Sequence, residues 1–155
     1  MTNGYLFRDA KKGDEQSVLS VVERVLTGFN LPFDPAGKDK DLCDIETSYF
    51  SNGGWLGVVE YAGQVIGSAG IYRLNEQVCE LRKMYLLPGH QGKGLGKKLL
   101  ELAMDNAGKL GFREMSLESH SSLKKANALY RKYGFVESFL EHTSARCDYA
   151  MKKIL

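Results

Sequence analysis

The chain has 155 residues, a length that suits one domain over 1–155 and leaves little room for a second. Hydrophobic residues make up 43% and charged residues 26%, which is ordinary for a globular domain and argues against a disordered chain. The net charge of +2 is too small to argue for nucleic acid or membrane binding by bulk electrostatics. We therefore expect neither as a partner.

The cysteines argue against a disulfide framework and against a metal site. Cys43, Cys79 and Cys147 are odd in number, widely spaced, and do not cluster with histidines at metal-ligand spacing. Free thiols in a reducing compartment explain them most simply. The N-terminus lacks a signal-peptide pattern, and no apolar stretch approaches the roughly 20 residues of a spanning helix. We expect a cytoplasmic protein without a metal.

The first third of the chain predicts a strand followed by helices. Residues 5–9 form a short strand, and Asp14 is placed as the N-cap of a helix that ends at Gly28 and Asn30. Apolar side chains recur along this helix at helical spacing: Val18, Val21, Val22, Val25, Leu26 and Phe29. After a loop with two prolines, a second helix is expected over 39–50.

The middle of the chain predicts an antiparallel meander of three strands. Residues 55–61 and 65–72 flank a tight turn, which is the pattern of a β-hairpin. A third strand covers 78–87 and ends at a Pro-Gly pair.

The rest of the chain predicts further alternation of helices and strands. In order, these are a helix from 92–94 to Gly111, a strand over 114–118, a helix over 122–133, and strands over 135–140 and 147–153. A helix between two strands of one sheet makes a parallel crossover. We therefore expect a mixed α/β domain with a cleft where strands 78–87 and 114–118 diverge.

The segment Gln91-Gly92-Lys93-Gly94-Leu95-Gly96 lies between a predicted strand and a predicted helix. Its glycines allow a sharp turn and a close approach of a ligand to the backbone. The first N–H groups of the helix have no internal partners, and the helix dipole makes that end positive. These properties predict a pyrophosphate site, with Lys93 and Lys97 adding to the field.

Two other phosphate-binding motifs do not fit this loop. A P-loop needs Ser or Thr after its Gly-Lys pair, and neither Gly92-Lys93 nor Gly96-Lys97 is followed by one. The dinucleotide fingerprint G-x-G-x-x-G would place its third glycine at 97, where the chain has lysine.

The loop instead fits the pattern Q-x-x-G-x-G, through Gln91, Gly94 and Gly96. Further on, Ala126-Asn127-Ala128-Leu129-Tyr130 and then Gly134-Phe135 fit A-x-x-L-Y-x-x-x-G-F. The order of these two motifs, and of the predicted elements, resembles the GNAT superfamily of N-acetyltransferases over the whole chain. The resemblance implies an α/β (α+β) fold: a mostly antiparallel central sheet with helices on both faces, and a splayed parallel strand pair forming an acyl-CoA cleft.

The resemblance also implies an activity and a set of cofactor contacts. Acetyl-CoA would be the co-substrate, and a primary amine of a small molecule, peptide or protein would attack it directly in a ternary complex. The strand end would bind the pantetheine arm and the loop amides the phosphates: Met84, Tyr85, Leu86, Gln91, Gly92, Lys93, Gly94, Leu95, Gly96 and Lys97.

Two residues are candidates for catalysis on the same basis. Tyr130 matches the tyrosine that protonates the departing thiolate, although a tyrosine on an amphipathic helix also suits a core. Glu80 resembles in position the catalytic glutamate of histone acetyltransferases, but it equally suits a salt bridge with Arg82. Many relatives also carry Asn seven residues before the tyrosine. This chain has Leu123 there, and Asn127, one turn later, is the candidate replacement.

The acceptor site implied by the resemblance covers about 29–52 and 140–147. The first region mixes aromatic and acidic residues, which would suit a cationic amine, although an ordinary solvated helix explains the acids without any ligand. The sequence does not name the acceptor and leaves a homodimer open. Two other classes remain: an acyl-CoA-binding sensor of the same fold without turnover, and an unrelated nucleotide-binding domain.

Overall fold

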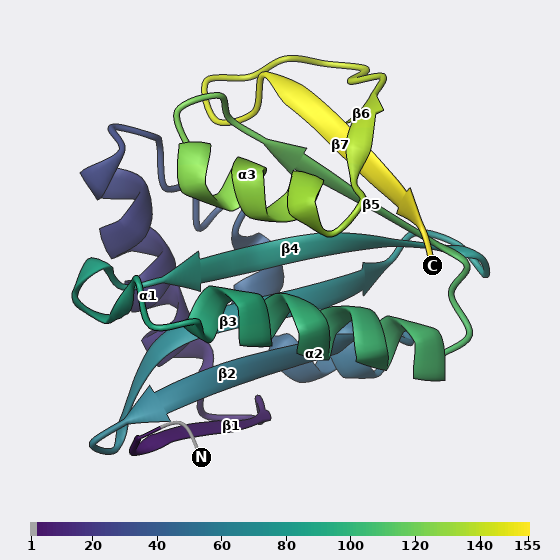
Figure 1. Ribbon diagram of the computed structural model, residues 1–155. Helices are drawn as coiled ribbons and strands as arrows, with labels where there is room; N and C mark the ends of the chain where they lie inside the picture. The colour runs from purple at the N-terminus through teal and green to yellow at the C-terminus, as the bar shows by residue number, and fades with distance from the viewer. Residues whose placement is uncertain (1–2) are drawn as a thin grey trace.

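A computed structural model describes residues 3–155 and contains one seven-stranded sheet in the order β1-β2-β3-β4-β5-β7-β6 (Figure 1). The strands are β1 (Tyr5–Asp9), β2 (Trp55–Tyr61), β3 (Gln64–Arg73), β4 (Val78–Leu86), β5 (Glu114–Ser119), β6 (Val136–Ser138) and β7 (Tyr149–Ile154). The helices are α1 (Glu15–Gly28), α2 (Leu95–Lys109) and α3 (Lys124–Lys132), with short helical turns η1 (Lys40–Cys43), η2 (Glu46–Phe50) and η3 (Pro88–His90).

Helices cover both faces of the sheet, as expected. Figure 1 shows α1 behind the sheet and α2 in front of it, with α3 beside β5 and β7. Two apolar cores result. One packs the buried side of α1 against β2, and the other packs α2 against β3, β4 and β5. The mixed sheet predicted from the element order is confirmed.

The parallel pair β4–β5 is short and then opens. The two strands are paired only from Val78↔Glu114 to Glu80↔Ser116, whereas both continue for several residues. Beyond Glu80, the facing edges of both strands are therefore left without strand partners. Unpaired strand edges present N–H and C=O groups that an extended ligand can bind.

A β-bulge in β4 contributes to this opening. Ser68 and Gly70 of β3 are opposite Tyr85 and Arg82, so β4 carries one extra residue between these pairs. Lys83 lies in the bulge with φ of 56°. The regular alternation of side chains along β4 therefore ends at Arg82. Because opposite residues share a face of the sheet, the bulge places Tyr85 on the face of Arg82.

The prediction of a second helix over 39–50 is wrong. The segment forms η1 and η2, separated by Asp44 in an extended conformation with φ −148° and ψ 89°. The Asp44 carboxylate accepts a hydrogen bond from the Thr47 amide (3.1 Å), a local bond that competes with continuous helix. Asp39 is turned into the protein and is fully buried.

The other predicted elements exist, with differences at their ends. Asp14 is the N-cap of α1, but its carboxylate binds Arg8 and the Lys11 amide instead of the helix amides. The helix expected from 92–94 begins at Leu95, and α3 begins at Lys124. Within residues 3–155, no helix combines the length and the apolar character needed to cross a bilayer.

Candidate active site

A cleft of about 780 Å³ opens where β4 and β5 separate. Its walls come from β4, β5, the first turns of α2 and α3, the end of α1 and the loop before η1. The cleft therefore has two halves. One is bounded by the glycine loop, α2 and α3, and we call it the cofactor half; the other is bounded by η1, its preceding loop and the segment before β7, and we call it the acceptor half.

The glycine loop has the geometry that the sequence analysis expects of an anion site. Gly92 and Gly94 have φ of 79° and 81°, a left-handed conformation that strains other residues. The space beside both glycines is open, so a ligand can reach the backbone there. The first helical backbone bond of α2 runs from the Lys98 amide to the Gly94 carbonyl (3.1 Å). No side chain caps the N–H groups before it, so they remain available to an anion.

The end of β4 and Gln91 shape the neighbouring wall. The residues of the predicted cofactor set that line the cleft are Met84, Tyr85, Leu86, Gln91, Gly92, Gly96 and Tyr130. The Gln91 side chain donates a hydrogen bond to the Leu86 carbonyl (3.0 Å) and so fixes the loop against the strand end. Lys93 and Lys97 are exposed on the loop and on α2, outside the lining.

Tyr130 lies on α3 with 6% of its surface exposed and lines the cleft. Its ring packs edge-on against Phe135, at 5.8 Å between centroids. Burial, followed by the nearby phenols of Tyr85 and Tyr149, raises the pKa of Tyr130. The hydroxyl therefore keeps its proton at neutral and mildly alkaline pH, as a hydrogen-bond donor must.

Glu80 also lines the cleft, and it is paired. Its carboxylate accepts a hydrogen bond from Arg82, as one of the two sequence interpretations expected. The Arg82 guanidinium stacks on the Tyr72 ring at 3.8 Å and lies 3.7 Å from Asp41. Glu80 thus has both features: an ion pair and a position on the cleft wall.

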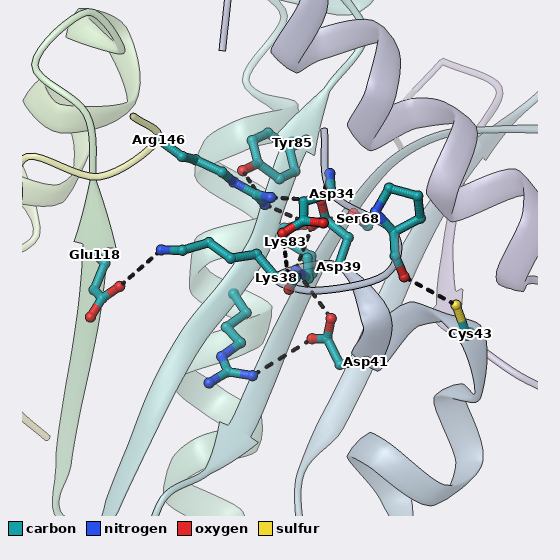
Figure 2. A network of polar contacts seen from close by, with 12 residues as sticks. Asp34, Lys38, Asp39, Asp41, Cys43, Ser68, Lys83, Tyr85, Glu118 and Arg146 are labelled. Carbon is teal, nitrogen blue, oxygen red and sulfur yellow. Dashed lines mark hydrogen bonds and ion pairs between the residues drawn. The ribbon is translucent and has the colours of Figure 1, made fainter. Parts of the chain in front are cut away.

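A buried polar network lies behind the acceptor half (Figure 2). Asp39 accepts two hydrogen bonds from Arg146 (2.6 and 2.7 Å) and one from Lys83 (2.7 Å). Burial alone would raise the pKa of Asp39, but these bonds outweigh it and the pKa lies below its ordinary value. Arg146 also donates to the Tyr85 hydroxyl (3.3 Å). Lys83 lies 3.2 Å from Asp41, too poorly aligned for a hydrogen bond.

This network joins segments that are far apart in the chain. Asp39 belongs to the turn before η1, Lys83 to the bulge of β4, and Arg146 to the loop before β7. The Lys83 ammonium also donates to the Lys38 carbonyl (2.9 Å). These roles could not be predicted from the sequence, since the three residues match no contiguous motif. One signal was available: Asp39 carries a charge at the start of the segment 39–50, whose apolar residues otherwise have helical spacing.

The acidic surface expected over 29–52 is not presented to the cleft. Of its acids, only Asp41 lines the cleft, and it contacts Lys83 and Arg82. Asp34, Asp44 and Glu46 are exposed outside the lining. The structure instead shows an ion pair across the cleft mouth, between Lys38 and Glu118 (3.7 Å).

Leu123 and Asn127 lie at the start and in the middle of the α3 region, and they differ in whether they face the cleft. Leu123 lines the cleft, but Asn127 does not. The Asn127 side chain accepts a bond from the Ser119 hydroxyl (2.7 Å) and donates to the His120 carbonyl (2.9 Å). Asn127 thus closes the turn between β5 and α3 and, contrary to expectation, does not face the cleft.

The three cysteines form no disulfide, and one of them lines the cleft. Cys147 is buried, with its sulfur 3.6 Å from the Lys38 ammonium. Burial raises the pKa of its thiol, although Lys38 acts in the opposite direction. A thiol that keeps its proton is a poor nucleophile.

Comparisons with known proteins agree with this geometry. The profile described as Acetyltransferase (GNAT) family matches residues 22–135. Escherichia coli YjgM, described as an uncharacterized N-acetyltransferase, is 39% identical over 79% of this chain and 76% of its own.

Two solved structures extend the comparison to the fold. A Streptococcus agalactiae acetyltransferase superposes with a TM-score of 0.88 at 20% identity, over 98% of this chain and 99% of that one. A phosphinothricin acetyltransferase of the GNAT superfamily from Sinorhizobium meliloti was solved in complex with acetyl-CoA. It superposes with a TM-score of 0.77 at 27% identity, over 100% of this chain and 89% of that one. The chain therefore belongs to the GNAT family, and it is an N-acetyltransferase.

Proposed function

We propose that this enzyme moves an acetyl group from acetyl-CoA to a primary amine, by direct attack in a ternary complex. The observation that carries the proposal is one continuous cleft. It joins a loop of open backbone amides, two unpaired strand edges and a buried phenol, and it continues into a charged acceptor half.

The residues present fit acetyl-CoA. The amides of Gly92 to Lys97 would take the pyrophosphate, because they lie at an uncapped helix start beside two left-handed glycines. The unpaired edge at Met84, Tyr85 and Leu86 would take the amide groups of the pantetheine arm. When bound, acetyl-CoA supplies a thioester, whose acyl carbon accepts an amine and whose thiolate leaves.

Tyr130 is proposed as the general acid. It lies on the cleft wall with its proton retained, so it can donate that proton to the thiolate sulfur as the C–S bond breaks. A buried hydroxyl is also worth more to a developing charge than an exposed one, because little water competes for the hydrogen bond.

Glu80 is proposed as the group that removes a proton from the amine, directly or through water. An ammonium has no lone pair, so one proton must leave before attack. Glu80 has a position on the cleft wall, and its bond to Arg82 fixes the carboxylate. The competing hypothesis, a purely structural ion pair, is tested below.

Direct attack is favoured over a covalent acetyl-enzyme. A two-step route needs a nucleophile in the cleft, and Cys147 is the cysteine that lines it. Its raised pKa keeps it protonated at neutral pH. We therefore expect kinetics in which both substrates must be bound before thiol is released.

A thermal-shift assay followed by a thiol-release assay separates this proposal from the two alternatives, an acyl-CoA-binding sensor without turnover and a nucleotide-binding domain. Acetyl-CoA at 100 times its Kd should stabilise the protein by about 2.7 kcal/mol, and ATP or NAD should not. An amine panel assayed by free-thiol release from acetyl-CoA should then show turnover. A shift without turnover on any amine would identify a sensor, and no shift with any acyl-CoA would reject the cofactor.

A further inference from the structure

The charges of the acceptor half are paired, and one pair differs from the rest. Asp39 and its partners Lys83 and Arg146 have side chains that are no more than 9% exposed. Asp41 and Glu80 are held by Arg82 and Lys83. One oxygen of Asp41 is buried without a hydrogen-bond partner, 3.2 Å from the Lys83 ammonium. The other charges of these groups are paired, so an incoming charged acceptor would have to break buried contacts to use them.

The pair between Lys38 and Glu118 is the exception. Its nitrogen and oxygen are 3.7 Å apart, and the two side chains are 41% and 44% exposed. Exposed pairs of this kind contribute little to stability, with a median of about 0–1 kcal/mol. Replacing this contact by contacts to a ligand therefore costs the fold little.

The two partners come from opposite walls of the cleft. Lys38 is in the loop before η1 and Glu118 is on β5, and both line the cleft (Figure 2). The Lys38 backbone is fixed, because its carbonyl accepts the Lys83 ammonium (2.9 Å) and its neighbour Asp39 is fully buried. The Lys38 ammonium has two weak side-chain contacts, to Glu118 (3.7 Å) and to the Cys147 sulfur (3.6 Å). Lys38 thus combines a held backbone with a weakly held ammonium, which is how a preorganised recognition residue is built.

The remaining lysines of the lining do not compete for this role. Lys124 and Lys125 are on α3, which bounds the cofactor half. The mouth of the acceptor half therefore offers one available cation and one available anion, a few ångströms apart. A polyamine carries several ammonium groups, but this site offers one available carboxylate, with the positive charge of Lys38 beside it. The site therefore suits a polyamine poorly.

From this arrangement, and resting on the proposed function, we propose that the acceptor is a zwitterion of the free α-amino acid type. Its carboxylate binds the Lys38 ammonium, and its ammonium binds the Glu118 carboxylate before losing a proton to the proposed base, Glu80, directly or through water. Each new contact is a charge-assisted hydrogen bond of the stronger kind. The acceptor thus takes the place of the ion pair across the mouth.

The test compares matched acceptors by thiol release from acetyl-CoA. The probes are the twenty L-amino acids, followed by the best one as its carboxamide and as the amine that lacks the carboxyl group. We expect the amino acid to exceed both derivatives in kcat/KM by about tenfold or more, as for the loss of one charged hydrogen bond.

Variants assign that preference to the two residues. Lys38→Met should raise KM for the amino acid about tenfold and leave KM for the carboxamide unchanged. Glu118→Gln should raise KM for both, because both carry the ammonium. Matched controls are Lys40→Met, on η1 outside the lining, and Glu114→Gln, on β5 outside the lining; neither should alter KM.

The outcomes separate this inference from the proposed function. Turnover of polyamines or peptide amines without turnover of free amino acids would overturn the zwitterion and keep the acetyltransferase. The same would follow if the carboxamide matched the amino acid, or if Lys38→Met kept the preference. Absence of thiol release with every amine would overturn both.

Discussion

The two halves of the cleft are built by different means. In the cofactor half, the proposed binding groups are backbone: positive φ at Gly92 and Gly94, uncapped amides at the start of α2, and an unpaired edge of β4. In the acceptor half, the proposed binding groups are the side chains of Lys38 and Glu118, beside buried ion pairs that join the η1 region, β4 and the loop before β7. Backbone sites tolerate sequence change around them, whereas side-chain sites change with single residues. One fold can thereby keep one cofactor and accept different amines.

The largest effect is expected when Asp39, which anchors the acceptor half, loses its charge. Asp39→Asn would leave the buried cations of Lys83 and Arg146 poorly compensated, which typically costs about 3–5 kcal/mol. Urea denaturation at pH 7 measures this loss. The matched control, Asp105→Asn on the exposed face of α2, should lose less than about 1 kcal/mol.

The pH dependence of that loss has a definite sign. The pKa of Asp39 is depressed below its ordinary 3.8, so its contribution is fully present above pH 3.8. It is lost as the pH falls through the folded-state value. The gap in unfolding free energy between wild type and Asp39→Asn should therefore be constant near neutral pH and shrink in strong acid. A gap that widens as the pH falls would contradict the assignment.

The second effect falls on chemistry in the cofactor half. Tyr130→Phe should lower kcat by about 10²-fold or more and leave the acetyl-CoA Kd unchanged, because only the proton donor is lost. Tyr133→Phe, near the end of the same helix and bonded to Glu101, is the control and should keep kcat. Equal kcat in wild type and Tyr130→Phe would remove the acid role.

The third effect tests whether backbone holds the phosphates. Gly94→Ala forces a side chain into a conformation with φ of 81° at the helix start. We expect the acetyl-CoA Kd to rise about tenfold by calorimetry, a change of about 1.4 kcal/mol. Gly89→Ala, at a glycine that is neither left-handed nor crowded, should leave the Kd unchanged.

The smallest expected effect concerns Glu80. Glu80→Gln should lower kcat/KM several-fold, most at low pH, where more of the amine is protonated and a base matters most. Glu114→Gln on the neighbouring strand is the control. A pH–rate profile that keeps its shape in Glu80→Gln would leave Glu80 as the partner of Arg82 alone.

The same contrast explains what the sequence could predict. The cofactor loop is contiguous, and its glycines and flanking elements specify a local conformation, so a helix after β4 could be predicted close to its observed start at Leu95. The parallel crossover followed from element order, and β4–β5 pairing confirms it. Asp39, Lys83 and Arg146 meet only in the folded chain, so their network could not be predicted from the sequence. Residues 39–50 were mispredicted as one helix because Asp44 interrupts the segment, with its carboxylate bonded to the Thr47 amide.

One measurement tests the division between the halves most directly. With the best amine of the panel, KM for acetyl-CoA and KM for the acceptor are measured together in Gly94→Ala and Lys38→Met. We predict that Gly94→Ala raises KM for acetyl-CoA alone, whereas Lys38→Met raises KM for the acceptor alone, each by about tenfold. If both variants raised the same constant, the cleft would not divide into a backbone half and a side-chain half.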